Sequence, residues 1–275
     1  MTTRPAGRRV QTFIVTKEHR RFTEFADTVR RHRYIGLCYG VAGIGKTLSA
    51  RRCAHWDLAE PLLLSWGPRD PSDTKVYSAV ARARTIFYTP AVSGPLNEFR
   101  KEVKLLSERA STCIEEANRA AKKGQSGRDA AGIELLIVDE AERLSTSALE
   151  YARDMFDRTN IGLILAGMPG IEKRMARYPQ LFSRVGFAHH YRPLLNDELS
   201  FVLTRHWRRL GLTMDEADFT DSQAIAAITR ITAGNFRLLH RLFVQIDRIL
   251  RINDLQVITE DVVEAARSTL VIGVT

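Results

Sequence analysis

The sequence predicts an α/β core built on a parallel sheet flanked by helices, followed by a small all-helical domain. Three observations support this fold class. Short apolar segments typical of strands alternate with longer segments of helical periodicity as far as residue 194. One of these strands leads directly into a glycine-rich turn that opens a helix. From Asn196 onward the strand signals stop and only helical patterns remain.

The composition is typical of a globular protein rather than a disordered, collagen-like or membrane-embedded one. Hydrophobic residues make up 44% and charged residues 27% of the 275 residues. The longest apolar runs, near Leu135–Val138 and Ile161–Ala166, are far too short to span a bilayer. Three widely spaced cysteines argue against a disulfide framework. We therefore expect a cytoplasmic protein with no membrane partner.

Positive charge is in excess, most of all near the N-terminal end of the sequence. The 41 Lys and Arg residues outnumber the 32 Asp and Glu residues, which gives a formal net charge of +9. Nine of the basic residues but only three acidic ones lie within residues 1–33. A balance of this kind suits a polyanionic partner such as a nucleic acid.

The individual elements follow from periodicity, caps and turn signals. Apolar residues at 22, 25 and 29 predict a helix over 17–32 with Thr16 as its N-cap. Strands are expected at 34–39, 85–89, 135–138, 161–166 and 186–191. Further helices are expected at 46–57, 96–123, 145–158, 196–210, 221–230, 235–251 and 259–269, with Asn196 and Thr259 as candidate caps. Residues 60–84 carry loop punctuation, so we expect an irregular segment there.

The glycine-rich turn matches the pattern G-x-x-x-x-G-K-T between a predicted strand and a predicted helix. Its glycines let successive backbone N–H groups face phosphate oxygens, and the helix N-terminus adds a favourable dipole. Lys46 is suited to the β- and γ-phosphates and the Thr47 hydroxyl to Mg²⁺. We therefore expect ATP and Mg²⁺ as cofactors. The candidate binding residues of this loop are Gly40, Gly43, Ile44, Gly45, Lys46 and Thr47.

Four apolar residues at 135–138 end in a pair of carboxylates, Asp139 and Glu140. In a fold with a phosphate loop, an acid at the end of a neighbouring strand can hold the metal and its water shell, and Asp139 fits this role together with Thr47. Glu140 is then placed to polarise an attacking water as general base. The alternative is a solvated acidic turn after a buried strand, which the preceding loop motif makes the weaker interpretation.

The order of these motifs, with a helical domain after them, resembles an AAA+ ATPase from about Phe13 to Leu270. The resemblance divides the chain into a basic N-terminal arm and helix (1–33), a nucleotide-binding core (34–194) and a C-terminal helical lid (195–275). It implies further site residues on the segments FIV, FSRV and GNFRLL. These are Ile14 and Val15 against adenine, Arg184 as an arginine finger reaching a neighbouring subunit's γ-phosphate, and Arg237 as a sensor in the lid.

One position departs from the AAA+ pattern. Many AAA+ proteins carry a polar residue after the fourth core strand, where it orients the attacking water. The strand at 161–166 is followed here by Gly167 and Met168, and a methionine side chain cannot orient water in that way. We therefore expect slow, regulatory hydrolysis.

Within the AAA+ proteins, the chain is similar to DNA-transposition regulators of the MuB, TniB and TnsC kind. The similarity lies in EHRRF and RYIGLCYG before GIGKT, and then in IVDEAERL, LAGMPG, FSRV and AGNFRLLHRL. It implies a ring or helical filament that assembles with ATP on duplex target DNA. Such an assembly recruits or activates a transposase, with a target-selection protein as a further partner, and hydrolysis drives its disassembly. A helicase-loader or replication-initiator ATPase, or a signalling or scaffold ATPase that does not bind DNA, stays open as an alternative.

Duplex DNA would be bound through its phosphates. The candidate surface is the helix expected at 96–123 with the loop after it, through Lys101, Lys104, Arg109, Lys122 and Lys123. Glutamates are interspersed along this helix, so an ordinary solvated face is the alternative. The basic arm is a second candidate. The sequence shows no base-reading motif, so we expect binding without sequence preference.

Overall fold

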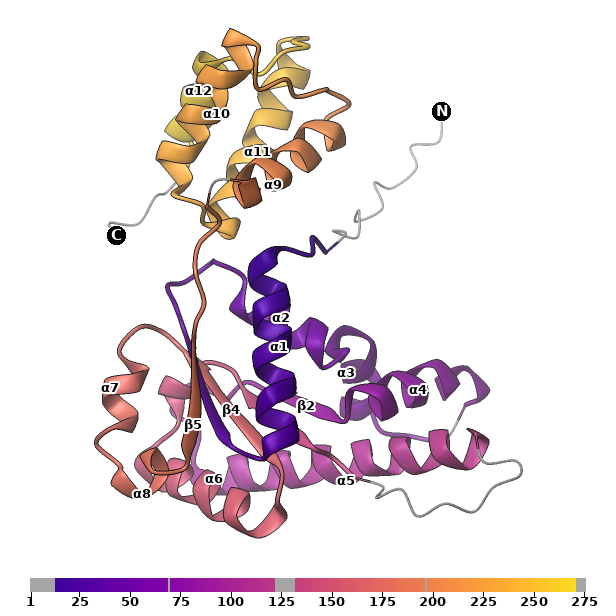
Figure 1. The fold of residues 1–275 in the computed structure, drawn as a ribbon. Helices are drawn as coiled ribbons and strands as arrows, with labels where there is room; N and C mark the ends of the chain where they lie inside the picture. The colour runs from indigo at the N-terminus through magenta and orange to yellow at the C-terminus, as the bar shows by residue number, and fades with distance from the viewer. Residues whose placement is uncertain (1–12, 69, 122–131, 196, 271–275) are drawn as a thin grey trace.

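A five-stranded parallel sheet organises the N-terminal two thirds of the chain (Figure 1). The computed structural model describes residues 13–68, 70–121, 132–195 and 197–270. The strands lie in the order β2-β3-β4-β1-β5. Strand β4 therefore lies between β1, which leads into the glycine-rich loop, and β3, which ends at Asp139. The bounds are β1 (Ile35–Tyr39), β2 (Thr85–Tyr88), β3 (Leu135–Val138), β4 (Gly162–Gly167) and β5 (Val185–His190).

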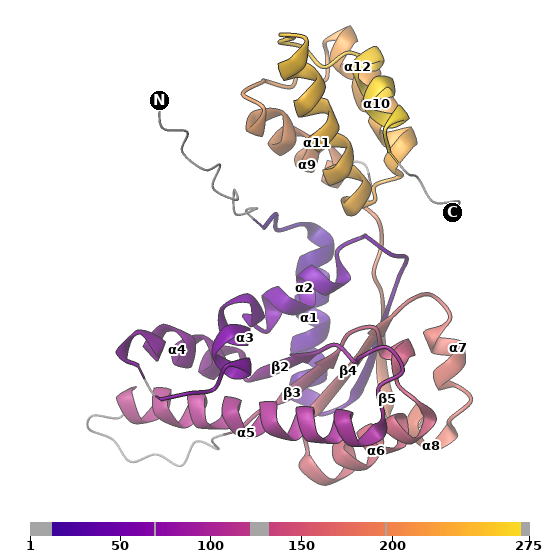
Figure 2. The ribbon, with the colours of Figure 1, turned by 180° about the vertical axis from the view of Figure 1, so that it is seen from behind.

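Helices cover both faces of this sheet. Helix α1 (Lys17–His32) crosses one face, and α5 (Leu96–Ala121) and α6 (Thr146–Thr159) lie on the other, as the two opposite views show (Figures 1 and 2). The central strands are buried along their whole length, as expected for a parallel sheet covered on both faces. The remaining helices of this part are α2 (Lys46–Cys53), α3 (Trp56–Leu64), α4 (Thr74–Ala83), α7 (Ile171–Met175) and α8 (Pro179–Phe182).

Four further helices form a separate bundle that stands above the C-terminal end of the sheet (Figure 1). They are α9 (Asp197–Arg209), α10 (Phe219–Thr232), α11 (Phe236–Ile252) and α12 (Glu260–Ser268). The bundle has a hydrophobic cluster of its own, centred on Trp207, Leu242 and Ile246. Ile14, which precedes α1, is buried in this cluster and not in that of the sheet. The segment before α1 therefore links the sheet to the bundle.

The predicted fold class is confirmed, since a parallel sheet flanked by helices is followed by a helical C-terminal region. All five strands lie where the sequence places them, to within one residue at each end. Thr16 and Thr259 cap α1 and α12 as expected, through hydrogen bonds from the backbone N–H groups of His19 and Val262. Asn196 lies outside the described residues. No helix in the described ranges has the length and apolar character needed to cross a bilayer.

Two predictions between residues 46 and 84 are wrong. The helix expected at 46–57 ends at Cys53, because His55 adopts a left-handed conformation with φ of 49° and a new helix begins at Trp56. The segment 60–84 is not irregular, since it contains the end of α3 and all of α4. The loop signals are confined to residues 67–73, and Val76, Val80 and Ala83 continue with helical spacing beyond them.

We predict that Gly36→Ala destabilises the sheet domain by about 1–3 kcal/mol, because it overpacks the contact between β1 and α1. A Cβ atom on Gly36 would lie 2.6 Å from Val29 Cγ2 and 2.7 Å from Phe25 Cζ. Chemical denaturation measures the free energy of unfolding. Gly132→Ala is the matched control, because nothing lies within 4 Å of a Cβ atom there. Equal stability of the two variants would contradict the close packing.

Candidate nucleotide-binding site

The glycine-rich loop closes over the end of β1 and starts α2. Gly43 and Gly45 have φ values of 81° and 109°, in the left-handed region that glycine adopts without strain. Gly40 begins the loop directly after β1. Ile44 is 3% exposed and packs into the sheet cluster, which anchors the loop from below. The predicted loop residues therefore form a single turn at the C-terminal edge of the sheet.

Lys46 points back over this loop. Its ammonium group donates hydrogen bonds to the carbonyl oxygens of Gly40, at 2.5 Å, and of Val41, at 2.9 Å. The side chain is buried, and burial lowers the pKa of Lys46. A phosphate is a stronger acceptor for this ammonium than a carbonyl group, because it carries negative charge. The lysine is thus held at the position where a phosphate in the loop would bind.

Thr47 and Asp139 meet across the end of the sheet, although they are far apart in sequence. The Thr47 hydroxyl donates to Asp139 Oδ2 at 2.6 Å. Burial raises the pKa of Asp139, and the hydrogen bond from Thr47 opposes this rise only in part. A hydroxyl and one carboxylate are the protein ligands that Mg²⁺ takes when phosphates and water complete its shell. A cation here would also favour the ionised carboxylate, so the two residues fit the ion.

Residues 139–143, which follow β3, form a turn that we call the acidic turn because it carries Asp139, Glu140 and Glu142. Within it, Glu140 has a φ of 50°. Its carboxylate forms an ion pair with Arg143, whose guanidinium also donates to the carbonyl oxygen of Pro90 at 3.1 Å. Sequence reasoning did not identify Arg143, or Glu142 beside it. One cavity of about 690 Å³ is lined by the loop, the acidic turn and part of the helical bundle. Its polar lining includes Lys46, Thr47, Asp139, Glu140, Glu142, Arg143 and Arg237.

The N-terminus of α11 is bonded directly to the glycine-rich loop. The Asn235 side-chain amide donates to the carbonyl oxygen of Ala42 at 2.7 Å, and the Arg237 backbone N–H donates to that of Gly43 at 2.9 Å. Asn235 also caps α11, because its Oδ1 accepts from the N–H groups of Arg237 and Leu238. The sequence indicated Arg237 but not Asn235, whose only local signal is that of an N-cap.

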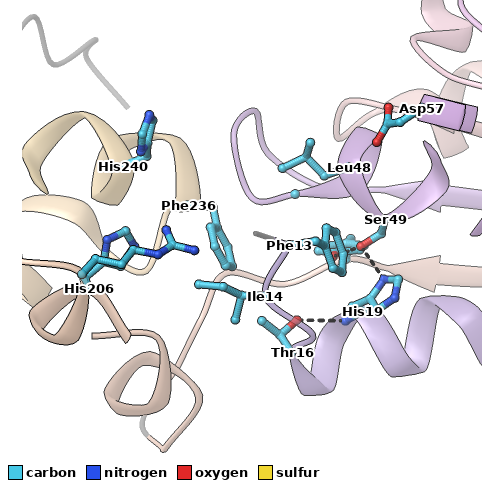
Figure 3. A pocket seen from close by; sticks show the side chains of 13 residues that line it. Phe13, Ile14, Thr16, His19, Leu48, Ser49, Asp57, His206, Phe236 and His240 are labelled. Atoms are coloured by element: carbon cyan, nitrogen blue, oxygen red, sulfur yellow. Dashed lines mark hydrogen bonds between the residues drawn. The ribbon is translucent and has the colours of Figure 1, made fainter. Parts of the chain in front are cut away.

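A second cavity, of about 170 Å³, adjoins the first (Figure 3). Phe13, Ile14, Leu48 and Phe236 give it an apolar lining from three distant parts of the chain. Gly45 borders both cavities. An apolar, partly aromatic space beside a phosphate loop is suited to an adenine ring. Polar and charged side chains complete its border, among them His19, Asp57, His206, Arg209 and His240.

Of the two residues predicted to contact adenine, only Ile14 lines the smaller cavity. Ile14 lines the smaller cavity and is buried, whereas Val15 is 44% exposed and does not line it. Met168 lines the larger cavity and is 41% exposed, so the end of β4 presents an apolar side chain to the site. The apolar border is therefore wider than the sequence indicated, since Leu48 and Phe236 were not predicted.

Arg184, the predicted arginine finger, does not line either cavity of its own chain. Its Nε lies 2.5 Å from Asp157 Oδ1 on α6, and a second nitrogen donates to the carbonyl oxygen of Gln180. The hydrogen bond with Arg184 lowers the pKa of Asp157. Arg184 is thus held by groups of its own chain, and its role as an arginine finger stays a prediction.

The predicted DNA-contacting residues do not form a single free surface. Lys101 and Lys104 are exposed on α5, and Lys104 lies 3.8 Å from Glu108. Arg109 instead donates to the carbonyl oxygens of Leu63 and Leu64, at 2.5 and 3.2 Å, so it ties α5 to the end of α3. Lys122 and Lys123 lie outside the described residues, as do Arg4, Arg8 and Arg9 of the basic arm.

Comparison with known proteins is consistent with this geometry. Residues 29–175 match the family model described as an AAA domain. The chain is 42% identical over 275 residues to a "Potential ATP-binding protein" of Staphylococcus aureus, covering 96% of this chain and 98% of that protein. It is 26% identical over 238 residues to the Mu-like prophage FluMu DNA transposition protein B of Haemophilus influenzae, covering 84% of this chain and 71% of that protein.

Two solved structures share the fold at low sequence identity. The Thermotoga maritima RuvB Holliday junction branch migration motor superposes with a TM-score of 0.54 at 15% identity, covering 94% of this chain and 70% of that chain. The ADP form of the Aeropyrum pernix ORC2 protein gives a TM-score of 0.55 at 16% identity, covering 96% and 71%. At these identities the likeness concerns the fold alone.

We predict that Lys46→Ala abolishes measurable ATP binding, because it removes the one charge that the loop holds over its own carbonyl groups. Isothermal titration calorimetry with ATP and Mg²⁺ measures this. Lys75→Ala, which removes an exposed lysine on α4, is the control and should bind like the parent protein. ATP affinity within a few-fold of the parent in Lys46→Ala would reject the assignment of the loop.

We predict that Asn235→Ala weakens ATP binding several-fold, because it frees the carbonyl of Ala42 and loosens the loop. It also removes the cap of α11, which costs about 1 kcal/mol of stability. Asp218→Ala is the matched control, since Asp218 caps α10 in the same way without touching the loop. Both variants should lose similar stability in thermal denaturation, but only Asn235→Ala should lose ATP affinity. Equal ATP affinity of the two variants would show that the contact does not organise the loop.

Proposed function

The chain belongs to the AAA domain family, and from this premise we propose that it is an ATPase that assembles on duplex DNA and there recruits or activates a transposase. In the proposed cycle, ATP binding permits assembly as a ring or helical filament, and hydrolysis drives disassembly. The cytoplasm is the proposed location, where the three free cysteines would stay reduced.

A single observation supports the nucleotide chemistry best. One cavity brings together Lys46 and Thr47 of the loop, Asp139 and Glu140 of the acidic turn, and Arg237 of the lid. Lys46 and the backbone N–H groups would bind the β- and γ-phosphates. Thr47 and Asp139 would hold Mg²⁺, which when bound neutralises charge that develops on the phosphates. Glu140 would accept the proton of the attacking water.

Two features bear on the rate and on assembly. Met168 itself offers at most a weak acceptor to a water at the end of β4, and we propose slow turnover. Arg184 lies away from the cavity of its own chain, and we propose that it completes the site of a neighbouring subunit. Hydrolysis would then depend on oligomerisation, as a regulatory ATPase requires.

The proposal of transposition rests on the relative named DNA transposition protein B, at 26% identity. RuvB and ORC2 share the fold alone, so they do not distinguish this proposal from a replication ATPase. Lys101 and Lys104 are the described residues of α5 that we propose for contacts to DNA phosphates. The remaining proposed partners are the transposase and a target-selection protein.

We predict that the protein forms rings or filaments on random-sequence duplex DNA only when ATP or a non-hydrolysable analogue is present. Glu140→Gln should slow turnover, because the amide cannot take the proton, and should leave assemblies that persist in ATP. Electron microscopy with and without nucleotide tests both statements.

The affinity for DNA should fall steeply as salt rises, since phosphate contacts release counterions.

Charge-reversal variants provide the control for the DNA surface. Lys101→Glu with Lys104→Glu should weaken DNA binding and reduce its salt dependence, whereas Lys75→Glu on α4 should not. Nucleotide-independent DNA binding, or a monomer in the presence of ATP and DNA together, would contradict the proposed function.

A further inference from the structure

Strand β4 ends at the centre of the nucleotide site, between the strands that carry the loop and the acidic turn. Its last residue, Gly167, pairs with Tyr39 at the end of β1, directly before the loop. Two residues earlier, Leu165 pairs with Val138, directly before Asp139. A polar side chain at the end of β4 would therefore face both phosphate and attacking water, but Gly167 and Met168 provide none.

The carboxylate of Glu142 occupies the space beside Gly167. A Cβ atom built on Gly167 would lie 2.4 Å from Glu142 Oε2 and 3.4 Å from its Cδ. The Glu142 carboxylate thus packs directly against the backbone of β4, in space that a side chain at residue 167 would occupy. Glu142 also lines the larger cavity with Lys46 and Asp139. A carboxylate from the neighbouring turn therefore stands where β4 lacks a polar group.

The two glutamates of the acidic turn have different surroundings. The Glu140 carboxylate forms an ion pair with Arg143. The Glu142 carboxylate has no hydrogen bond or ion pair with another residue in the described part of the chain. Its backbone is nevertheless fixed, because Arg174 on α7 donates to the carbonyl oxygens of Glu142, at 2.6 Å, and of Leu144. The backbone of Glu142 is thus held in position, while its side chain is exposed and its acceptor oxygens are free for a ligand in the cavity.

We propose that Glu142 replaces the missing polar residue of β4 and accepts a hydrogen bond from the attacking water. The inference rests on the proposed ATP hydrolysis. In that step the water oxygen bonds to the γ-phosphorus while the bond to the β–γ bridging oxygen breaks, and the proton passes to Glu140. Glu142 accepts the second O–H of the water without taking its proton, so it orients the water along the line of attack.

Two cations in the same cavity allow a second carboxylate near the phosphates. Lys46 lines the cavity from the start of α2, and Arg237 lines it from α11. Burial lowers the pKa of Lys46, and the negative charge of Glu142 is one of those that oppose this effect. The attraction between these opposite charges is stronger in a partly buried site than in water.

The test compares ground-state binding with binding of a transition-state mimic. Glu142→Ala should lower kcat by about 10- to 100-fold, as expected when a reacting group is no longer aligned. Its Kd for ATP should stay within about threefold of the parent. Its affinity for ADP with aluminium fluoride, measured by calorimetry, should fall by the same factor as kcat, because that complex captures the in-line water. Thermal denaturation verifies the fold.

Two further variants make the result specific to Glu142. Glu172→Ala removes an acid from α7 that does not line the cavity, and it should behave like the parent protein. Glu142→Ala combined with Met168→Asn should recover part of the lost kcat, because it returns a polar group to the end of β4.

Three results would overturn the inference. One is unchanged turnover and unchanged affinity for ADP with aluminium fluoride in Glu142→Ala. Another is an equal loss of ATP and mimic affinity, which would indicate a ground-state role. The third is no recovery of kcat in the double variant. If the parent protein binds ATP without hydrolysing it, the proposed function fails, and the affinity for the mimic alone then decides the role of Glu142.

Discussion

The structure depends on one contact between its two parts, the bonding of α11 to the glycine-rich loop. Ala42 and Gly43 direct their carbonyl groups toward the Asn235 side chain and the Arg237 backbone N–H, while Gly40 and Val41 accept from Lys46. Four consecutive carbonyl groups of the loop thereby accept hydrogen bonds from Lys46 or from the start of α11. This leaves the N–H side of the loop for a ligand. A change in the loop on binding phosphate must then alter its contact with the lid.

Glu18 makes a second connection between the same two parts of the chain. Its carboxylate lies 3.1 Å from His189 Nε2 on β5 and accepts from the N–H of Arg192, and its own N–H donates to Glu198 on α9. Burial alone would raise the pKa of Glu18, but hydrogen bonds from His189 and Arg21 outweigh this and lower it. Polar contacts therefore join the helical bundle to the rest of the chain at the start of α9, through Glu198, and at the start of α11, through Asn235 and Arg237.

The site residues that could be predicted from the sequence are those that lie in a short motif next to a predicted strand. Asp139 directly follows a buried strand, and Lys46 ends the loop that follows another, so their place at the edge of the sheet follows from the fold class. Contacts between residues far apart in sequence carried no such local signal, and Arg237 was indicated only by the resemblance to AAA+ proteins. Asn235 contacts the loop from 193 positions away, and Arg109 contacts Leu63 from 46 positions away. Arg109 looked like a solvated or DNA-contacting cation because its carbonyl partners cannot be inferred from the helix pattern alone.

The two adjoining cavities relate this geometry to control by nucleotide. A nucleotide that fills both would contact Phe13 before α1, Gly45 in the loop and Phe236 in the lid at once. These three segments belong to different parts of the fold, and Ile14 buries the first of them against the lid cluster. A ligand stabilises the arrangement for which it has higher affinity. Contacts at the adenine end and at the phosphate end of the nucleotide would therefore stabilise the same position of the helical bundle. In the proposed assembly, such a coupling would allow a small ligand to determine which surfaces of the bundle and the sheet domain meet a neighbouring subunit.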